Sequence, residues 1–320
     1  MIKMNREKTL LKAFQRGHLL SLKNRRYKGW IEKFIVDETK GDIGTGDVTS
    51  NAVLGKKDPI AKAIIRTREP GIVAGVEEAT FLYRSYGLKV KQLKKDGQLM
   101  KKGDKLIELK GGEKELLKLE RSGIDVLQRM SGIATLTYNL IKKTNRRVMI
   151  APTRKTHWRY MDKKAVYDGG GLTHRLALWE SILIKDNHLT ALRREGIKDS
   201  IGVALERAWK QRKKGIFVEI EVDNKKDAIR ATEKFKELQA KSNGKPCLIM
   251  LDNMRPKEIK LIVAELKRKK LYDHILLEAS GGINPQNIAA YSKTGVDVLS
   301  LGYLTHSSRS LNIKQEIIKK

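Results

Sequence analysis

The sequence has little or none of several features that define other classes of protein. Its only cysteine, Cys247, begins an apolar run, so a disulfide framework and a cysteine metal site are excluded and a buried thiol is expected. No apolar stretch approaches the ~18 to 20 residues that span a bilayer, and the N-terminus lacks a signal-peptide pattern. We therefore expect a cytoplasmic globular protein with no membrane partner.

Acidic and aromatic residues are also scarce. The chain has 67 Lys and Arg against 37 Asp and Glu, a formal net charge of +30, and only 6% aromatic residues. Such a charge attracts polyanions, including nucleic acids, anionic membranes and phosphorylated small molecules. The basic residues are spread along the chain, and no zinc finger, basic zipper or aromatic RNA-binding motif is present. A nucleic-acid-binding protein is thus an alternative, but a nucleic-acid partner is not expected.

From about residue 147 onward, short apolar runs recur, and each stops at a charged or glycine-rich end. Helical spacing of apolar residues fills several of the intervals between them. This alternation predicts a parallel sheet closed, or nearly closed, into an α/β barrel. The runs are RVMIAPTRK (147–155), ILIKDNH (182–188), FVEIEVDN (217–224), CLIMLDN (247–253), ILLEASGG (275–282) and VDVLSLGYLTH (296–306).

Reactive residues of α/β barrels lie at the carboxyl ends of the strands. Lys185 follows its apolar run at such an end, and similar residues end the other runs, so we expect them to line one site. Glycine turns there suit a phosphate, arginines suit carboxylates, and two carboxylates on neighbouring strands suit ribose hydroxyls or a hydrated Mg²⁺. The residues in these positions are Arg154, Lys155, Lys185, Glu221, Asp252, Ser280 and His306.

The first half of the chain has a different pattern. Residues 58–75 and 87–111 alternate apolar and polar side chains between turn residues, which predicts a half-exposed antiparallel sheet in a separate α+β domain. Residues 114–144 have helical spacing, with an expected break at Ser131-Gly132. The basic first 30 residues are expected to be a solvated helix face or a partly disordered arm.

A series of short motifs, in order and with suitable gaps over residues 30–312, resembles quinolinate phosphoribosyltransferase. The resemblance implies an open seven-stranded α/β (TIM-like) barrel with an N-terminal α/β sandwich domain, an obligate homodimer with a hexamer left open, and dependence on Mg²⁺. It also implies transfer of phosphoribosyl from phosphoribosyl pyrophosphate to quinolinate, with release of pyrophosphate and CO₂, in NAD synthesis. The motifs are GDIGTGDVTS, GIVAGVEEA, ERSGIDVLQRMSGIATLT, TRKT, AVYDGGGLTHR, LIKDNH, EIEVDN, IMLDNM, EASGGI and TGVDVLSLGYLTHS.

The resemblance also implies roles for individual residues. The family's quinolinate-binding cations correspond to Arg154, Arg175 and Lys185. Arg121 corresponds to a family arginine that reaches into the active site from the partner subunit. Residues near pyrophosphate and quinolinate match Lys155 and His174. The family's residues at the ribose and the metal correspond to Glu221 and Asp252, which would hold Mg²⁺ through water. Residues around the 5′-phosphate match Ser280, Gly281, Gly282, Gly302 and His306. Lys155, Lys185, Glu221 and Asp252 are the residues expected to be catalytic.

The expected domains are a basic extension (1–30), the sandwich domain (31–126), the barrel (127–306) and a C-terminal tail (307–320). A related phosphoribosyltransferase with another substrate is a further alternative. The family commonly has a Thr-Pro-Gly turn after TRKT, where this chain has only His157. His157 and His188 have no second His or Cys at metal-ligand spacing, so hydrogen-bonding roles are expected for both.

Overall fold

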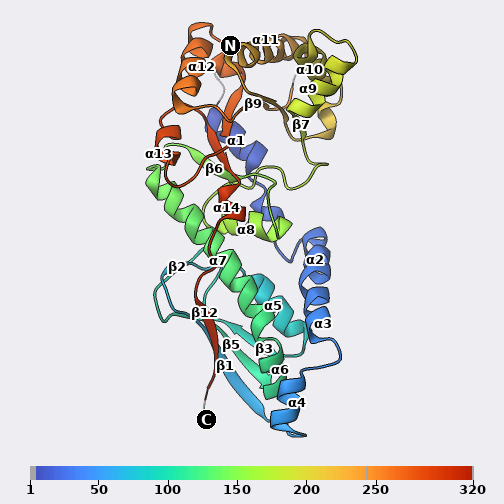
Figure 1. Ribbon diagram of the computed structural model, residues 1–320, viewed down its shortest axis with the longest axis vertical. Helices are drawn as coiled ribbons and strands as arrows, with labels where there is room; N and C mark the ends of the chain where they lie inside the picture. Colours follow the sequence, from blue (N-terminus) through green and yellow to red (C-terminus); the bar gives the residue numbers. More distant parts are fainter. Residues whose placement is uncertain (1–4, 243, 319–320) are drawn as a thin grey trace. The chain divides into compact units, whose positions relative to one another are not determined.

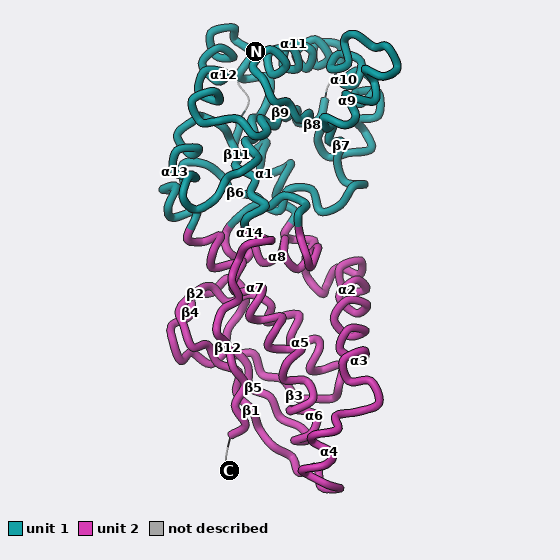
Figure 2. Tube along the Cα trace, viewed as in Figure 1, with its two compact units in different colours: residues 1–16, 140–155, 171–303 teal, residues 17–139, 156–170, 304–320 magenta. Residues whose placement is uncertain are grey.

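The structure of the protein is a computed structural model that describes residues 5–242 and 244–318. The chain divides into two compact units (Figure 2). Unit 1 comprises residues 1–16, 140–155 and 171–303, and unit 2 comprises residues 17–139, 156–170 and 304–320. Within the described residues, no helix combines the length and apolarity needed to cross a membrane.

Unit 1 is built on a parallel sheet of order β6-β11-β10-β9-β8-β7 (Figure 1). Each predicted apolar run supplies one strand, and the predicted α/β barrel class is confirmed. The strands are nearly continuous apolar segments because helices and the barrel interior cover their two faces. They are β6 (Met149–Pro152), β7 (Ile182–Ile184), β8 (Val218–Val222), β9 (Cys247–Asp252), β10 (Leu276–Ser280) and β11 (Val298–Leu301).

Helices of unit 1 follow the strands as the apolar spacing predicts. Asn224 accepts the amide of Asp227 and begins α11, and Pro256 occupies the first turn of α12, where its missing N–H leaves no bond unmade. The helices are α9 (Asp186–Arg194), α10 (Ser200–Lys210), α11 (Lys225–Lys241), α12 (Pro256–Arg268) and α13 (Ile288–Tyr291).

The sheet has six strands within the described residues, whereas the resemblance implied seven. Residues 171–175 run beside β6, since the Leu172 amide donates to the Ile150 carbonyl at 2.8 Å. His174 has φ +54°, in the left-handed region, which interrupts the extended backbone that a strand requires. Where the family has a seventh strand, residues 171–175 of this chain are joined to β6 by the hydrogen bond of Leu172, and they form no regular strand pairing in the described structure.

The N-terminal segment differs from its prediction. Residues Arg6–Phe14 form helix α1, and Asn5 begins it by accepting the Lys8 amide. Leu10 and Phe14 are buried among Phe217, Leu248 and the first residues of other strands. The expectation of a partly disordered arm is wrong for this segment. The alternative of a solvated helix face describes only the exposed side of α1, because its other face fills the amino end of the barrel.

Unit 2 contains the predicted antiparallel sheet, of order β12-β1-β5-β3, and a second small sheet of β2 and β4. Its edge strand β12 (Ile313–Ile317) pairs with β1 and comes from the segment expected as a C-terminal tail. The remaining strands are β1 (Ile60–Thr67), β2 (Gly71–Ile72), β3 (Lys89–Gln92), β4 (Leu99–Met100) and β5 (Lys105–Gly112).

The helices of unit 2 include one long element, α7 (Glu120–Lys143), whose last residues enter unit 1. It is unbroken at Ser131-Gly132, where a break was expected. Ser131 exchanges hydrogen bonds with the backbone of Ala74, and the missing side chain of Gly132 admits the backbone of Arg309. The others are α2 (Arg25–Ile31), α3 (Asp37–Ile43), α4 (Val48–Leu54), α5 (Val76–Ser85), α6 (Glu113–Lys118), α8 (Arg159–Asp168) and α14 (Tyr303–His306).

Candidate active site

The carboxyl ends of the parallel strands in unit 1 bring most of the sequence-predicted residues to one edge of the sheet. Lys185 follows β7 directly, and Asp252 and Ser280 are the last residues of β9 and β10, paired in register. Glu221 is the penultimate residue of β8. Arg154 lies two residues beyond β6, and Gly302 is the first residue after β11. We call this edge the carboxyl edge.

The closest contact at the carboxyl edge joins Lys185 to Glu221. The Lys185 Nζ atom lies 2.5 Å from Glu221 Oε2, across neighbouring strand ends. Partial burial raises the pKa of Glu221, although the hydrogen bond from Lys185 opposes the shift. The Lys185 amide donates to His188 Nδ1 at 2.9 Å, so the hydrogen-bonding role expected for His188 is confirmed.

Asp252 completes a pair of carboxylates at the carboxyl edge. Partial burial raises its pKa, while the charges of Lys185 and Lys155 act in the opposite direction. The Asp252 charge in turn contributes to the raised pKa of Glu221. Each carboxylate disfavours the ionised form of the other, and a divalent cation between them would stabilise both negative charges. Mg²⁺ prefers oxygen ligands such as these. The donor set of Glu221 and Asp252 therefore fits Mg²⁺.

Arg175 is a buried cation beside another cation. Its side chain is buried, and burial followed by the charge of Arg154 lowers its pKa. Its Nη1 donates to the Ser181 carbonyl at 3.0 Å, whereas its buried Nε has no hydrogen-bond partner among the described residues. A buried N–H without an acceptor is costly, and an anion at this position would remove the cost.

A layer of buried polar side chains lies directly inside the carboxyl edge. Side chains two residues apart in a strand share one face, so Glu219 and Glu278 follow Glu221 and Ser280 inward. His174 Nε2 lies 3.6 Å from Glu219 and 3.3 Å from Glu278. Burial, and next the charge of Glu278, raise the pKa of Glu219 well above its ordinary value. The pKa of Glu278 is lowered, because the effect of burial is outweighed there by His174.

The three buried residues His174, Glu219 and Glu278 bring their polar atoms close enough to surround a cation. The hydrogen bonding of the ring argues against that use. The Arg175 amide donates to His174 Nδ1 at 2.6 Å, so the ring proton of the neutral imidazole is on Nε2, the atom that faces the carboxyls. A protonated nitrogen donates a hydrogen bond and does not ligate a metal. Sequence reasoning missed Glu219 and Glu278, although their spacing of two from site residues was a signal.

Arg121 and His306 belong to unit 2. Arg121 is exposed on α7 and pairs with Asp125 at 3.3 Å. It lines a hollow of about 550 Å³ together with Phe34, Trp158 and His157. His306 Nδ1 lies 2.6 Å from the hydroxyl of Ser307.

The short turn after TRKT is closed by a buried ion pair. Asp162 accepts the amides of His157 and Trp158, at 3.0 and 3.1 Å. Arg129 donates to both oxygens of Asp162 and to the Thr305 carbonyl. The turn is thereby fixed without the glycine and proline that the family commonly has. The hydrogen bond of His157 is made by its backbone amide, so the role expected for its side chain stays a prediction.

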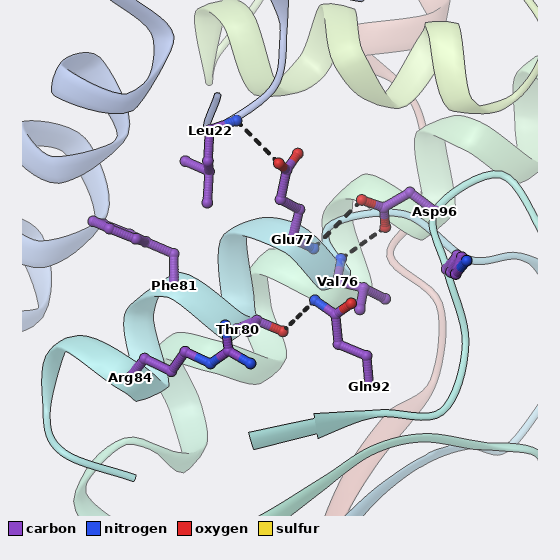
Figure 3. Close-up of a pocket in the computed structure, with 9 residues that line it drawn as sticks. Leu22, Val76, Glu77, Thr80, Phe81, Arg84, Gln92 and Asp96 are labelled. Carbon is purple, nitrogen blue, oxygen red and sulfur yellow. Dashed lines mark hydrogen bonds between the residues drawn. The ribbon is translucent and has the colours of Figure 1, made fainter. Parts of the chain in front are cut away.

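A second hollow of unit 2, of about 460 Å³, lies at the beginning of α5 (Figure 3). Asp96 accepts the amide of Val76 at 2.8 Å, and Glu77 accepts that of Leu22 at 3.0 Å. None of the sequence-predicted site residues lines this hollow. Its polar groups bond within unit 2, Asp96 and Glu77 to backbone amides and Gln92 to the hydroxyl of Thr80.

Comparison with known families assigns the chain. The model described as "Quinolinate phosphoribosyl transferase, N-terminal domain" matches residues 47–131, and that for the C-terminal domain matches residues 133–316. The chain belongs to the quinolinate phosphoribosyltransferase family. Both domains of the family are therefore present, in the order that the motifs predicted.

Members of the quinolinate phosphoribosyltransferase family from several organisms resemble the chain over most of its length. The probable nicotinate-nucleotide pyrophosphorylase (carboxylating) of Methanocaldococcus jannaschii is 36% identical over 302 residues, covering 91% of this chain and 99% of that protein. The corresponding protein of Methanothermobacter thermautotrophicus is 35% identical over 283 residues, covering 87% and 95%. The solved nicotinate-nucleotide pyrophosphorylase of Francisella tularensis has a TM-score of 0.78 at 28% identity, covering 91% and 96%.

Proposed function

We propose that the chain transfers a phosphoribosyl group from phosphoribosyl pyrophosphate to quinolinate, with loss of CO₂, and forms nicotinate mononucleotide for NAD synthesis. The observation that carries this proposal is the match of both family domains over residues 47–131 and 133–316. The relatives' names, nicotinate-nucleotide pyrophosphorylase (carboxylating), describe the same reaction. The geometry of the carboxyl edge supports it independently.

The cations of the carboxyl edge suit the two adjacent carboxylates of quinolinate. Arg154 and Arg175 present neighbouring guanidinium groups, and the Arg175 Nε lacks an acceptor. Guanidinium groups hold planar carboxylates through paired hydrogen bonds, and a dicarboxylate would relieve the repulsion between the two arginines. A monocarboxylate would leave part of this buried positive charge uncompensated. His174 and Lys185 complete the proposed quinolinate site.

Phosphoribosyl pyrophosphate is proposed to bind along the other strand ends. Ser280, with the glycine turns at Gly281-Gly282 and Gly302, would hold the 5′-phosphate by backbone N–H groups. Lys155 would contact the pyrophosphate. Glu221 and Asp252 would hold Mg²⁺ through water, and the ion when bound would neutralise charge on the pyrophosphate.

The reaction then needs alignment and charge stabilisation rather than a side-chain nucleophile. The C1–pyrophosphate bond breaks and the ring nitrogen bonds to C1, which makes that nitrogen cationic. The bond to the C2 carboxylate breaks next, the electron pair stays on C2 beside the cationic nitrogen, and a proton fills the position. The cations at the carboxyl edge bring together two anions that repel each other in water, and Glu221 and Asp252 face the positive charge at C1.

We also propose a homodimer in which Arg121 serves the site of the partner. Arg121 is exposed, and its ion pair is with an exposed residue of its own helix, Asp125, so its guanidinium group is accessible. In a two-fold dimer each subunit would lend its arginine to the other.

The test of the function is a reaction containing the purified protein, quinolinate, phosphoribosyl pyrophosphate and Mg²⁺, analysed for nicotinate mononucleotide. We expect one product and one CO₂ for each quinolinate consumed. Glu221→Ala and Asp252→Ala should each lower kcat by about a hundredfold or more while the protein stays folded, since electrostatic groups of a site contribute factors of this size. No product from the folded wild-type protein would contradict the proposal.

A further inference from the structure

The N-terminal segment contacts the part of the barrel that carries His174 and Arg175. α1 ends at Phe14, and its last carbonyl accepts two hydrogen bonds from Thr173, from the amide at 3.0 Å and from the hydroxyl at 2.7 Å. The Arg16 amide donates to the same hydroxyl oxygen at 2.9 Å. All of these residues belong to unit 1, and Thr173 is fully buried. The residue before His174 is therefore fixed by the N-terminal segment.

The aromatic ring of Phe14 holds the imidazole itself. The ring centroids of Phe14 and His174 are 4.1 Å apart, and Phe217 packs against both rings. His174 has φ +54°, a backbone conformation that costs a non-glycine residue energy and persists only where its surroundings hold it. The contacts with Phe14 and Thr173 supply such surroundings.

Arg16 holds the far end of the same loop. Its Nε lies 3.0 Å from Glu180 Oε1, and the side chain of Glu180 is buried. The other oxygen of Glu180 accepts the Leu176 amide at 2.5 Å. The loop from Thr173 to Glu180 is thus held at both ends, and Arg175 lies between them.

We propose that Phe14 and Arg16 are positioning residues of the quinolinate site, which fix the loop 173–180 and with it the buried guanidinium group of Arg175, whose Nε has no acceptor among the described residues. The inference rests on the proposed function for the identity of the ligand. The N-terminal segment lies outside both matched family models, which begin at residue 47. Residues that touch no substrate would then determine how well the chain binds quinolinate.

The test compares variants of the loop contacts with a control in the same N-terminal segment. Arg16→Ala removes the ion pair to Glu180, Phe14→Leu removes the ring contact while keeping an apolar side chain, and Arg16→Lys restores a charge. The control is Arg6→Ala, because Arg6 also makes an ion pair, with two hydrogen bonds to Asp297 against the one from Arg16 to Glu180, and it lies away from the loop. Quinolinate and phosphoribosyl pyrophosphate KM, kcat, the melting temperature and hydrogen exchange of residues 173–181 are measured for each.

We expect Arg16→Ala and Phe14→Leu to raise the KM for quinolinate about tenfold, the size of one lost charged hydrogen bond. The KM for phosphoribosyl pyrophosphate should change less than twofold, Arg16→Lys should recover part of the loss, and exchange in the loop should rise. Arg6→Ala should lower the melting temperature without changing the KM for quinolinate or exchange in the loop.

Two results would overturn the inference. One is faster exchange of the loop with an unchanged KM for quinolinate, and the other is an equal change of KM in Arg6→Ala, which would show only a general loss of stability. If a variant at Phe14 does not fold, the Arg16 variants alone decide. A wild-type protein that forms no product contradicts the proposed function, whereas exchange in the loop still reports whether Phe14 and Arg16 hold it.

Discussion

At the scale of single residues, the largest concentration of buried charge surrounds Lys164 in unit 2. Its Nζ lies 2.7 Å from Asp96, 3.3 Å from Asp168 and 3.4 Å from Glu78. Burial, then the charges of Asp96 and Glu78, raise the pKa of Asp168 to about 7, although Lys164 opposes the shift. One ammonium group therefore does not keep all of its buried carboxylate neighbours ionised at neutral pH.

This cluster predicts a pH dependence of stability. The pKa of Asp168 is about 7 in the folded chain against an ordinary value of 3.8, so the folded state binds more protons between these values. The contribution of Asp168 to the free energy of unfolding is therefore fully present below its ordinary pKa of 3.8 and is lost as pH rises toward 7. Asp168→Asn, which stays neutral, should gain stability relative to the wild type as pH rises from about 4 to 7, so its advantage should be larger at pH 8 than at pH 5. Thermal unfolding across this range measures it.

Asp42→Asn is the matched control for the Asp168 experiment, because Asp42 is an exposed aspartate of the same unit. Its difference in melting temperature from the wild type should stay constant from pH 5 to pH 8. A constant difference for Asp168→Asn as well would contradict the raised pKa of Asp168.

Some of the site residues could be predicted from the sequence, and others could not. Lys185, Glu221 and Asp252 could be predicted because each ends an apolar strand, and parallel strands bring such ends together. Glu219 was missed: its spacing of two from Glu221 places it on the same face of β8, but the partners of its buried carboxyl come from distant parts of the chain. Arg16 likewise contacts Glu180, a residue far along the chain that no local pattern connects with it.

At the scale of secondary structure, the prediction succeeded where burial leaves a periodic pattern. All six parallel strands are long apolar runs, and α10, α11 and α12 show helical spacing. A helix was one of the two expectations for the N-terminal segment, but the burial of α1 was missed because its buried face is narrow and interrupted by basic residues. Strand β12 was missed because a short edge strand with alternating polar residues resembles a tail.

The prediction of a break in α7 was wrong, for a reason that can be tested. Gly132 is retained by close packing, because a Cβ there would clash with the carbonyl oxygen of Arg309. Gly132→Ala should therefore reduce the free energy of unfolding by about 1 to 3 kcal/mol, despite the higher helix propensity of alanine. Chemical denaturation measures this difference.

Gly29→Ala is the control for the change at Gly132, since nothing lies within 4 Å of a Cβ at this position of α2. We expect it to leave stability unchanged or to increase it by up to about 1 kcal/mol. A stabilised Gly132→Ala protein would show that helix propensity, not packing, governs this position.

At the scale of the whole molecule, the net charge of +30 indicates that the protein binds an anionic partner. It does not show whether that partner is a phosphorylated small molecule, a nucleic acid or a membrane. The choice came from the order of motifs, which the family models match over both domains. Composition cannot separate a phosphorylated substrate from a nucleic acid, because both are read by the same cations.

The proposed dimer predicts complementation between two inactive variants. In a mixed dimer of Arg121→Ala and Lys155→Ala subunits, one site keeps its own Lys155 and receives an intact Arg121, and the other site lacks both. With random reassortment about half of the dimers are mixed, so roughly a quarter of all sites should recover activity. Exchange verified by mass spectrometry without any recovery would contradict the shared site.

The most direct test of the central claim, that the carboxyl edge of unit 1 binds a dicarboxylate for phosphoribosyl transfer, is a competition between quinolinate and nicotinic acid. Both are offered at equal concentration with phosphoribosyl pyrophosphate and Mg²⁺, and quinolinate labelled in its C2 carboxyl group reports its own consumption as released CO₂. Because Arg154 and Arg175 need two carboxylates, quinolinate should be consumed at least about a hundredfold faster, the factor that 2.7 kcal/mol represents. Comparable consumption of nicotinic acid, or product formed without release of labelled CO₂, would contradict the account.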